Sequence, residues 1–289
     1  MSEMGEKLVS TFSIVAYDPE SEELGVAVQS KFLGVGGIVP YAEAGVGAVA
    51  TQSLANPTYG PEGLRLLKEG MSPGATVHHL TREDEDEAWR QVGIVDASGN
   101  AATYTGEDCY EWAGGITGNG YAVQGNLLVS EETVTSMAET FEKTEGSLSE
   151  RLLSSLESGQ SAGGDKRGMQ SAAILVVKEG GGYDGLTDRL VDLRVDDHTE
   201  PIQELKRIYR LHQLYFGESN EQDILTIEGT TKEEMKRHLK RLGYIPTTNI
   251  SDTILNKSLT TFINTENFEG RAQPDGLIDA HVLEFMKTR

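Results

Sequence analysis

The chain has 289 residues, with 46 acidic against 25 basic side chains and a formal net charge of −21. This length suits one domain of about 200 residues with an appended module, and the 37% of hydrophobic residues can form a packed core. The acidic balance disfavours nucleic acid and anionic membrane surfaces as partners, because both require a basic face.

A single cysteine, Cys109, excludes an intrachain disulfide and a cysteine-based metal cage. The first ten residues lack the basic flank and apolar run of a signal peptide, and no stretch has the apolar length of a membrane helix. We therefore expect a soluble, cytoplasmic protein.

Short strand patterns separated by polar or glycine-rich turns dominate the first half of the chain. Apolar runs rich in β-formers predict six strands, and the short turns between them favour antiparallel pairing. The predicted strands are Thr11–Tyr17, Leu24–Ser30, Gly34–Pro40, Gly45–Gln52, Arg90–Asp96 and Ala101–Tyr104.

Helix start and stop signals flank several amphipathic segments, with proline or serine at the first turn and glycine after the last. The predicted helices cover residues 61–69, 72–80, 130–143 and 149–158, followed by a long helix that opens at Pro201. Two further strands, Ser171–Lys178 and Arg189–Val195, precede that last helix.

The order of strands, helices, strands and helix is segregated rather than alternating, which favours an α+β domain with antiparallel sheets. The sequence pattern changes at a polar segment, residues 217–223, after which Lys/Arg-rich helical patterns begin. We predict an N-terminal extension at 1–10, a main domain at 11–216, a linker at 217–223 and a helical module at 224–289.

Two motifs favour structural interpretations. GGGYDG, residues 180–185, fits G-x-G-x-x-G, but a strand follows it, so no helix N-terminus could receive a pyrophosphate and a hairpin loop is predicted. The acid-rich stretch 184–198 matches no calcium loop and is expected to be a solvent face. We predict no metal and no cofactor. Cys109 lies among carboxylates, which raise the pKa of a thiol and disfavour a thiolate nucleophile.

Small polar residues gather at the ends of the predicted strands. Such a set could converge at one rim and supply a nucleophile, a cation and oxyanion donors, or it could satisfy turn backbones. The candidate substrate-binding residues are Ser13, Ser30, Gln52, Asn56, Gln124, Asp165, Arg167 and Gln170, beside the candidate catalytic residues Thr11, Lys31 and Asn126.

Six ordered blocks resemble one family over about residues 11–216. They read TFSIVAYDPESEELGVAVQSKF, GVGAVATQSLANPTYGPEGL, RQVGIVDASG, YAVQGNLL, GGDKRGMQSAAILVV and DRLVDLRVDDH. The family, domain of unknown function 1028, is similar to the N-terminal-nucleophile (Ntn) hydrolases. The resemblance implies a four-layer αββα sandwich, with the paired helices of 131–158 in one outer layer.

The resemblance also implies a mechanism. Ntn hydrolases cleave amides with a Thr, Ser or Cys at the chain's own N-terminus, whose free α-amine is the base, with a pKa of about 7.7–8.0. The matching residue here is Thr11, with Lys31 as a candidate electrostatic partner and with Gln52, Asn56, Gln124 or Asn126 as oxyanion donors.

This sequence departs from the family in one respect. Ten residues, 1–10, precede Thr11, whereas relatives commonly start just before this position. Thr11 gains a free amine only if the Ser10–Thr11 bond is cut. Two hypotheses follow: the chain is processed, or the scaffold is catalytically inactive.

The C-terminal segments LKRLGY, LTTFINTENFEGR and PDGLIDAHVLEFM resemble a small peptidoglycan-binding-type helical module. The resemblance implies an all-α unit, which we expect to serve as a scaffold or interaction surface, because wall binding requires export. Its expected core is Leu239, Leu242, Ile254, Leu259, Phe262, Leu277, Ile278, Val282 and Phe285.

The sequence thus predicts an Ntn-type hydrolase of amide or peptide bonds that requires removal of residues 1–10. The alternative is an inactive ligand-binding or assembly protein on the same scaffold. The expected partners are a small-molecule or peptide amide and a second copy of the chain, with neither nucleic acid nor membrane and with cell wall disfavoured.

Overall fold

The computed structural model describes residues 10–217 and 219–289. The predicted extension at 1–10 therefore lies outside the described residues except for Ser10, and the predicted linker at 217–223 is described except for residue 218. The chain divides between Ile208 and Tyr209 into two compact units. The helix α5, Pro201–Phe216, spans this division.

Two antiparallel sheets form the centre of the first unit. The six-stranded sheet has the order β10-β9-β2-β1-β8-β7, and the four-stranded sheet has the order β3-β4-β5-β6. The strands are β1 Thr11–Asp18, β2 Glu23–Ser30, β3 Pro40–Glu43, β4 Gly47–Ser53, β5 Arg90–Asp96, β6 Ala101–Thr105, β7 Gly114–Gly118, β8 Tyr121–Gly125, β9 Ser171–Val177 and β10 Arg189–Val195.

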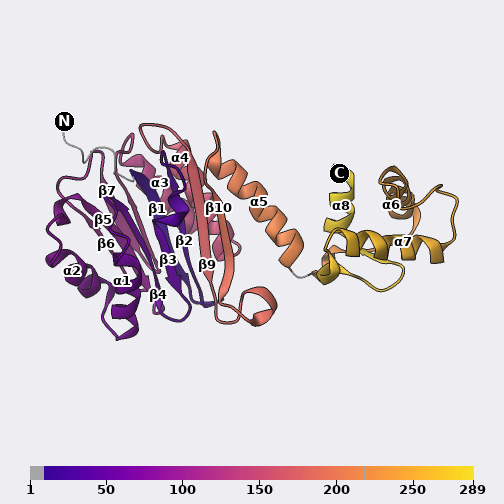
Figure 1. Ribbon diagram of the computed structural model, residues 1–289, viewed down its shortest axis with the longest axis horizontal. Helices are drawn as coiled ribbons and strands as arrows, with labels where there is room; N and C mark the ends of the chain where they lie inside the picture. Colours follow the sequence, from indigo (N-terminus) through magenta and orange to yellow (C-terminus); the bar gives the residue numbers. More distant parts are fainter. Residues whose placement is uncertain (1–9, 218) are drawn as a thin grey trace. The chain divides into compact units, whose positions relative to one another are not determined.

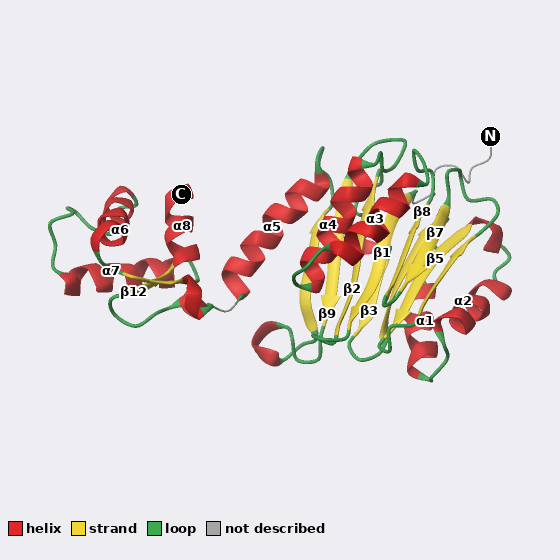
Figure 2. Cartoon of the chain, turned by 180° about the vertical axis from the view of Figure 1, so that it is seen from behind, coloured by secondary structure: helices red, strands yellow, loops and turns green. Residues whose placement is uncertain are grey.

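Helices cover the outer face of each sheet (Figures 1 and 2). The helices α3, Glu132–Lys143, and α4, Leu148–Ser161, lie on the six-stranded sheet, while α1, Tyr59–Lys68, and α2, Pro73–Arg82, lie on the four-stranded sheet. The four layers follow the order α-β-β-α, so the predicted four-layer sandwich with antiparallel sheets is confirmed.

The alternation of side chains along β1 explains its position between two layers. Phe12 reaches α4 near Gly159, whereas Ser13 points to the opposite sheet and bonds Gln52 of β4. Val15, two residues further, joins the apolar core between the sheets. Because both faces of the strand are buried, β1 reads as an almost continuous apolar run.

One predicted strand is wrong. Residues Gly34–Pro40 form the 3-10 helix η2, Val35–Gly37, and strand β3 begins only at Pro40. Gly34 takes a left-handed backbone with φ 68°, and the Ser171 hydroxyl accepts from Val35 N at 3.1 Å, so tertiary contacts override the apolar pattern. The strands β7 and β8 were not among the predicted elements.

The hairpin predicted around GGGYDG is confirmed, because β9 and β10 pair antiparallel on either side of it. The remaining short 3-10 helices of the described chain are η3 Glu87–Trp89, η4 Tyr183–Gly185, η5 Glu221–Asp223 and η6 Glu269–Arg271.

The second unit is a small helical module, as predicted, with a short two-stranded sheet in addition. Its elements are β11 Ile224–Thr226, α6 Gly229–Arg241, α7 Asp252–Thr265, β12 Leu277–Asp279 and α8 Ala280–Thr288. Leu239, Phe262 and Val282 are fully buried in its core. Ile254, expected in that core, is 48% exposed; its neighbour Leu255 is buried instead.

Within the described ranges, every helix is too short or too polar to span a bilayer.

Candidate active site

Thr11 begins strand β1 at one end of the sandwich. It pairs with Ser30 of β2, which in turn pairs with Ser171 of β9, so three hydroxyl-bearing residues stand side by side at this edge. Thr11 shares the strand face of Ser13, the face toward the second sheet, and it has no exposed surface. Strand pairing therefore puts the candidate nucleophile between the two sheets.

The backbone of Thr11 is fixed from both sheets. Its carbonyl oxygen accepts from Asn126 N at 3.0 Å and from Gln52 Nε2 at 3.3 Å. Asn126 follows β8 in the same sheet, whereas Gln52 belongs to β4 of the opposite sheet. Two predicted site residues thus hold the main chain of Thr11 in place.

A chain of buried side-chain hydrogen bonds crosses between the sheets beside Thr11. Ser13 Oγ donates to Gln52 Oε1 at 2.6 Å and accepts from Gln124 Nε2 at 2.7 Å. All three side chains lack exposed surface. Gly93 of β5 makes this packing possible, because an added Cβ would lie 1.9 Å from Gln124 Oε1.

Gln91 of β5 links this chain of bonds to the end of β8. Its Oε1 accepts from both Gln52 Nε2 and Asn126 Nδ2 at 2.8 Å, and its Nε2 donates to Thr105 Oγ1 at 2.9 Å. A further bond of 2.7 Å reaches the Gly125 carbonyl. We call these six side chains the amide network: Ser13, Gln52, Gln91, Thr105, Gln124 and Asn126.

The backbone is left-handed directly after two members of the amide network. Ser53 follows Gln52 with φ 66°, and Leu127 follows Asn126 with φ 52°. Such conformations cost about 1 kcal/mol or more in a non-glycine residue and persist where surrounding contacts enforce them. They are typical of functional sites, where local backbone strain is retained.

The amide network cannot transfer protons at neutral pH. Its members are amides and hydroxyls, and the hydrogen bonds of these side chains within the described residues go to backbone carbonyls or to one another. Amides donate and accept hydrogen bonds without titrating. The network can orient groups and stabilise charge, but a general base must come from elsewhere.

An ion pair lies at the same edge, beside the residue before Thr11. Asp165, with a fully buried side chain, binds Arg167 through Nε at 3.1 Å and NH2 at 2.7 Å. Arg167 NH2 also donates to the Ser10 carbonyl at 3.0 Å, and Ser30 Oγ donates to that same oxygen. Two predicted substrate-binding residues, Ser30 and Arg167, therefore bond the carbonyl oxygen that precedes Thr11, and a third, Asp165, holds Arg167.

The side chains of the other predicted residues, Lys31, Gln170 and Asn56, bond groups away from Thr11. Lys31 is exposed and its Nζ donates to the Met169 carbonyl at 3.2 Å, although its backbone N reaches Asp165. Gln170 donates to Asp197, with a distance of 3.1 Å between Nε2 and Oδ1. Asn56 lies on the side of the four-stranded sheet, where its Nδ2 donates to Asp84 Oδ2 at 3.0 Å.

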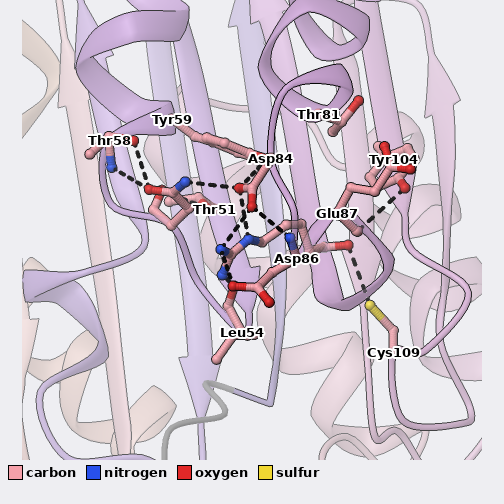
Figure 3. Close-up of polar contacts among 12 residues, drawn as sticks. Thr51, Leu54, Thr58, Tyr59, Thr81, Asp84, Asp86, Glu87, Tyr104 and Cys109 are labelled. Carbon is pink, nitrogen blue, oxygen red and sulfur yellow. Dashed lines mark hydrogen bonds and ion pairs between the residues drawn. The ribbon is translucent and has the colours of Figure 1, made fainter. Parts of the chain in front are cut away.

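Asp84 is the centre of a second polar cluster, which follows the ends of β4 and α2 (Figure 3). Its carboxylate accepts from Arg90 Nε at 2.9 Å, from Tyr59 OH at 2.7 Å and from Asn56. Arg90 NH1 continues to the Leu54 carbonyl at 2.6 Å. Asn56, Tyr59 and Asp84 also line an open cavity of about 410 Å³.

The contribution of the Asp84–Arg90 pair to the free energy of unfolding depends on pH in a predictable direction. Burial alone would raise the pKa of Asp84, but hydrogen bonds from Arg90, Asn56 and Tyr59 hold it well below its usual range. Because the pKa of Asp84 is lower in the folded than in the unfolded chain, the ionised carboxylate stabilises the fold at pH values above the unfolded pKa of about 3.9. This stabilisation is lost as the pH falls below that value.

We expect Asp84→Asn to lower the free energy of unfolding by about 3 kcal/mol at pH 7, because Arg90 loses its buried counter-ion. The difference from wild type should narrow below about pH 4, where the Asp84 carboxyl of the unfolded chain takes up a proton while that of the folded chain is still ionised. Urea unfolding across pH measures this, with the exposed neighbour Glu85→Gln as control. A stability difference between Asp84→Asn and wild type that does not change with pH would contradict the role of the Asp84 carboxylate as the counter-ion of Arg90.

Cys109 is buried and donates from Sγ to the Arg90 carbonyl at 3.4 Å. Burial is the largest cause that raises the pKa of its thiol, and nearby Asp108 adds to it. The raised pKa agrees with the expected direction, with burial rather than neighbouring charge as its main cause.

Sequence reasoning missed three residues that the structure joins to these sites: Gln91, Asp84 and Arg90. Gln91 opens the apolar strand QVGIV, and a polar residue at an inward-facing strand position is the signal that could have identified it. Arg90 begins the predicted strand Arg90–Asp96, and no motif in the sequence links it to Asp84. In the described chain, no group of three His, Cys, Asp or Glu side chains could hold a metal ion.

Comparison with known proteins gives two family matches. Residues 11–205 match a model described as a family of unknown function, DUF1028. Residues 215–286 match one described as "Putative peptidoglycan binding domain". No protein with a curated description matches this chain.

Similar solved structures include the following two. Protein SPO2555 from Silicibacter pomeroyi, assigned to DUF1028, is 33% identical with a TM-score of 0.65, and the match covers 71% of this chain and 86% of that one. Anbu (ancestral beta-subunit) from Yersinia bercovieri is 11% identical with a TM-score of 0.32, covering 70% of this chain and 94% of that one.

Proposed function

This chain belongs to DUF1028, a family of unknown function, and we propose from its site that it hydrolyses amide or peptide bonds as an N-terminal-nucleophile enzyme. Thr11 would be the nucleophile. The observation that carries the proposal is the position of Thr11 at the start of β1, with its carbonyl held by Gln52 and Asn126 beside the amide network.

The absence of titrating groups from the amide network supports an α-amine as the base. A Thr11 amine, once released, would have a pKa of about 7.7–8.0 and could accept the hydroxyl proton near neutral pH. Removal of residues 1–10 is therefore part of the proposal. The substrate carbonyl would be attacked by Thr11 Oγ1, and an acyl-enzyme would then be hydrolysed by water.

Amide donors would stabilise the oxyanion of this reaction. Asn126 Nδ2 carries two hydrogens and gives one to Gln91 Oε1, which leaves the other for a substrate oxygen. Its amide is fixed by Gln91, so little reorganisation is needed during the reaction. Lys31 would add positive charge at this edge of the sheet, at a greater distance.

The proposal assigns the enzyme to the cytoplasm and takes small-molecule or peptide amides as its substrates. Residues 209–289 would serve as an interaction surface. The single buried cysteine, Cys109, is compatible with a reducing compartment.

The direct test uses a chain that begins at Thr11, produced by cutting a removable leader immediately before it. A β-lactone, which acylates threonine hydroxyls, is the probe. We expect one acyl adduct on Thr11 by peptide mass and hydrolysis of members of an aminoacyl-p-nitroanilide panel. The same chain with an N-acetylated Thr11 is the control and should lack both. An unlabelled Thr11 in the pre-cut chain would reject the proposed function.

A second candidate is an inactive ligand-binding or assembly protein. The observation that favours it is the complete burial of Thr11 when Ser10 precedes it. In this case the full chain would bind ligand without turnover.

A further inference from the structure

The Arg167 guanidinium has a second edge beside Thr11. A guanidinium carries five donor hydrogens in a planar fork. Arg167 Nε and NH2 give one hydrogen each to Asp165, at 3.1 Å and 2.7 Å, and NH2 gives its other hydrogen to the Ser10 carbonyl at 3.0 Å. The edge formed by NH1 and NH2 is therefore directed toward the space that the Ser10 carbonyl occupies.

This edge is held in place by the protein and remains accessible. The Asp165 side chain is fully buried and accepts from the backbone N–H groups of Lys31 and Arg167, at 3.2 Å and 2.9 Å. The Arg167 side chain itself is 36% exposed. Asp165 thus fixes one edge of the guanidinium, and a group fixed in this way binds a ligand with little loss of conformational freedom.

Ser30 supplies a further donor to the same space. Its Oγ donates to the Ser10 carbonyl at 2.5 Å, and the residue has no exposed surface. Ser30 is the β2 residue paired with Thr11, so the strand register sets its position. In a chain that begins at Thr11, Ser30 and Arg167 both lose the Ser10 carbonyl, and a buried donor without a partner is unfavourable. An oxygen of a ligand would restore both bonds.

We propose that Ser30 and Arg167 bind a carboxylate of the substrate, and that this carboxylate belongs to the leaving amine. The substrates are then N-acyl amino acids, or peptides cut at their C-terminal residue. This inference rests on the proposed function, since it places the substrate at Thr11 of the chain that begins there. It narrows the substrate from amides in general to amides of amino acids.

The position of the two donors assigns the carboxylate to the leaving side. The Ser10 carbonyl carbon is bonded to Thr11 N, so Ser30 and Arg167 converge next to that nitrogen. In the proposed reaction the Thr11 amine returns a proton to the leaving nitrogen, which must therefore lie within hydrogen-bond reach of it. The carboxylate carbon of an α-amino acid is two bonds from its nitrogen. The acyl group lies on the other side, toward Thr11 Oγ1.

The products follow from this orientation. The bond from the acyl carbon to Thr11 Oγ1 forms and the bond from that carbon to the substrate nitrogen breaks. The hydroxyl proton passes through the Thr11 amine to that nitrogen, which leaves as a free amino acid. Water then hydrolyses the ester, which releases the acyl group as a carboxylic acid and restores the hydroxyl.

A carboxylate suits this site better than a neutral oxygen. The free edge of a guanidinium matches the two oxygens of a carboxylate, and Asp165 already binds the other edge in this bidentate way. A C-terminal amide offers one neutral oxygen. Because hydrogen bonds between charged groups are stronger, we expect the free acid to be preferred by about 10–10²-fold in kcat/KM.

The experiment compares the N-acetyl derivatives of alanine, leucine and phenylalanine with their C-terminal amides on the chain that begins at Thr11. Release of the amine measures turnover. Arg167→Lys keeps a counter-ion for Asp165 but loses the bidentate edge, and Ser30→Ala removes one donor. Each should raise the KM of the free acids by about tenfold or more and leave the KM of the amides unchanged. The control is Lys166→Ala, a neighbouring cation whose Nζ bonds the Glu111 carbonyl at 3.0 Å.

Calorimetric binding of the same N-acetyl compounds separates this inference from the proposed function. If the β-lactone labels Thr11 but free acids and amides are bound and hydrolysed alike, the carboxylate site is wrong and the proposed function stands. If Thr11 is neither labelled nor active, but the free acids bind and Arg167→Lys weakens them, the site stands and the hydrolase is wrong. Failure of the free acids to bind, or an undiminished preference for them in both variants, overturns the inference.

Discussion

Replacement of Thr11 by valine is expected to abolish amide hydrolysis by the chain that begins at this residue. Valine keeps the branched shape of threonine and removes the hydroxyl that would attack the substrate. Loss of a nucleophile costs several orders of magnitude in kcat, about 10⁶-fold in a well-studied serine protease. Steady-state hydrolysis of p-nitroanilides and β-lactone labelling both measure the effect.

The matched control is Thr11→Ser, which keeps an attacking oxygen and should retain measurable turnover. The fold should survive both changes, because β1 is held by two neighbouring strands. Turnover of Thr11→Val at the wild-type rate would remove Thr11 from the mechanism. If neither wild type nor Thr11→Val hydrolyses amides but a ligand raises the melting temperature of both, the inactive binding protein is the better description.

Replacement of Arg271 by alanine should destabilise the C-terminal module by about 3–5 kcal/mol, because it leaves a buried carboxylate without its counter-ion. Arg271 NH1 bonds Asp279 at 2.8 Å, and the two side chains are 5% and 0% exposed. Burial alone would raise the pKa of Asp279, but Ser219 and Arg271 hold it below its usual range.

Arg271 also bonds the C-terminal part of α5, which belongs to the same compact unit. Its Nε and NH2 donate to the carbonyls of Leu214 and Gln213 at 2.6 Å each, near the C-terminal end of that helix. The loss would therefore remove the arginine donor from the Leu214 carbonyl as well as from a carboxylate, whereas the Gln213 carbonyl keeps its bond from Gly217 N at 2.9 Å. Asp279 additionally caps α8 by accepting from His281 N at 2.7 Å.

Hydrogen exchange of the full chain, read by peptide mass, tests the Arg271 prediction. Protection should fall in α6, α7 and α8 and stay unchanged in β1 and β2. The control is Arg289→Ala, which removes an ion pair with Glu266. Because the Arg289 side chain is 56% exposed, this variant should change hydrogen exchange little. Equal protection in Arg271→Ala and wild type would show that the buried pair is not needed.

The layered architecture followed from the sequence because its evidence is local. Thr11–Tyr17 and Leu24–Ser30 are rich in β-formers with a polar turn between them, and the paired helices near 131–158 have their own start signals. The prediction of a strand was wrong at Gly34–Pro40, where contacts from the distant strand β9 stabilise a 3-10 helix in a glycine-rich segment. It also overlooked β7 and β8, whose glycines hide their strand character.

The candidate site was only partly accessible to sequence reasoning. Polar residues at strand ends indicated Ser13, Gln52, Gln124 and Asn126, because polar side chains next to apolar strands are uncommon in a core. The sequence could not tell that Gln91 joins them, or that Lys31 turns outward. Those facts depend on which strands pair and on which face of each strand meets the other sheet.

The sequence by itself determined the class of the fold, the identity of the candidate nucleophile and the presence of residues before it, since periodicity and residue order are properties of the chain. Only the tertiary structure decided that Ser30 and Arg167 meet at one carbonyl oxygen and that Asp84 and Asp279 have buried partners. Contacts between residues 20 to 157 positions apart depend on strand register and packing, which no local pattern specifies.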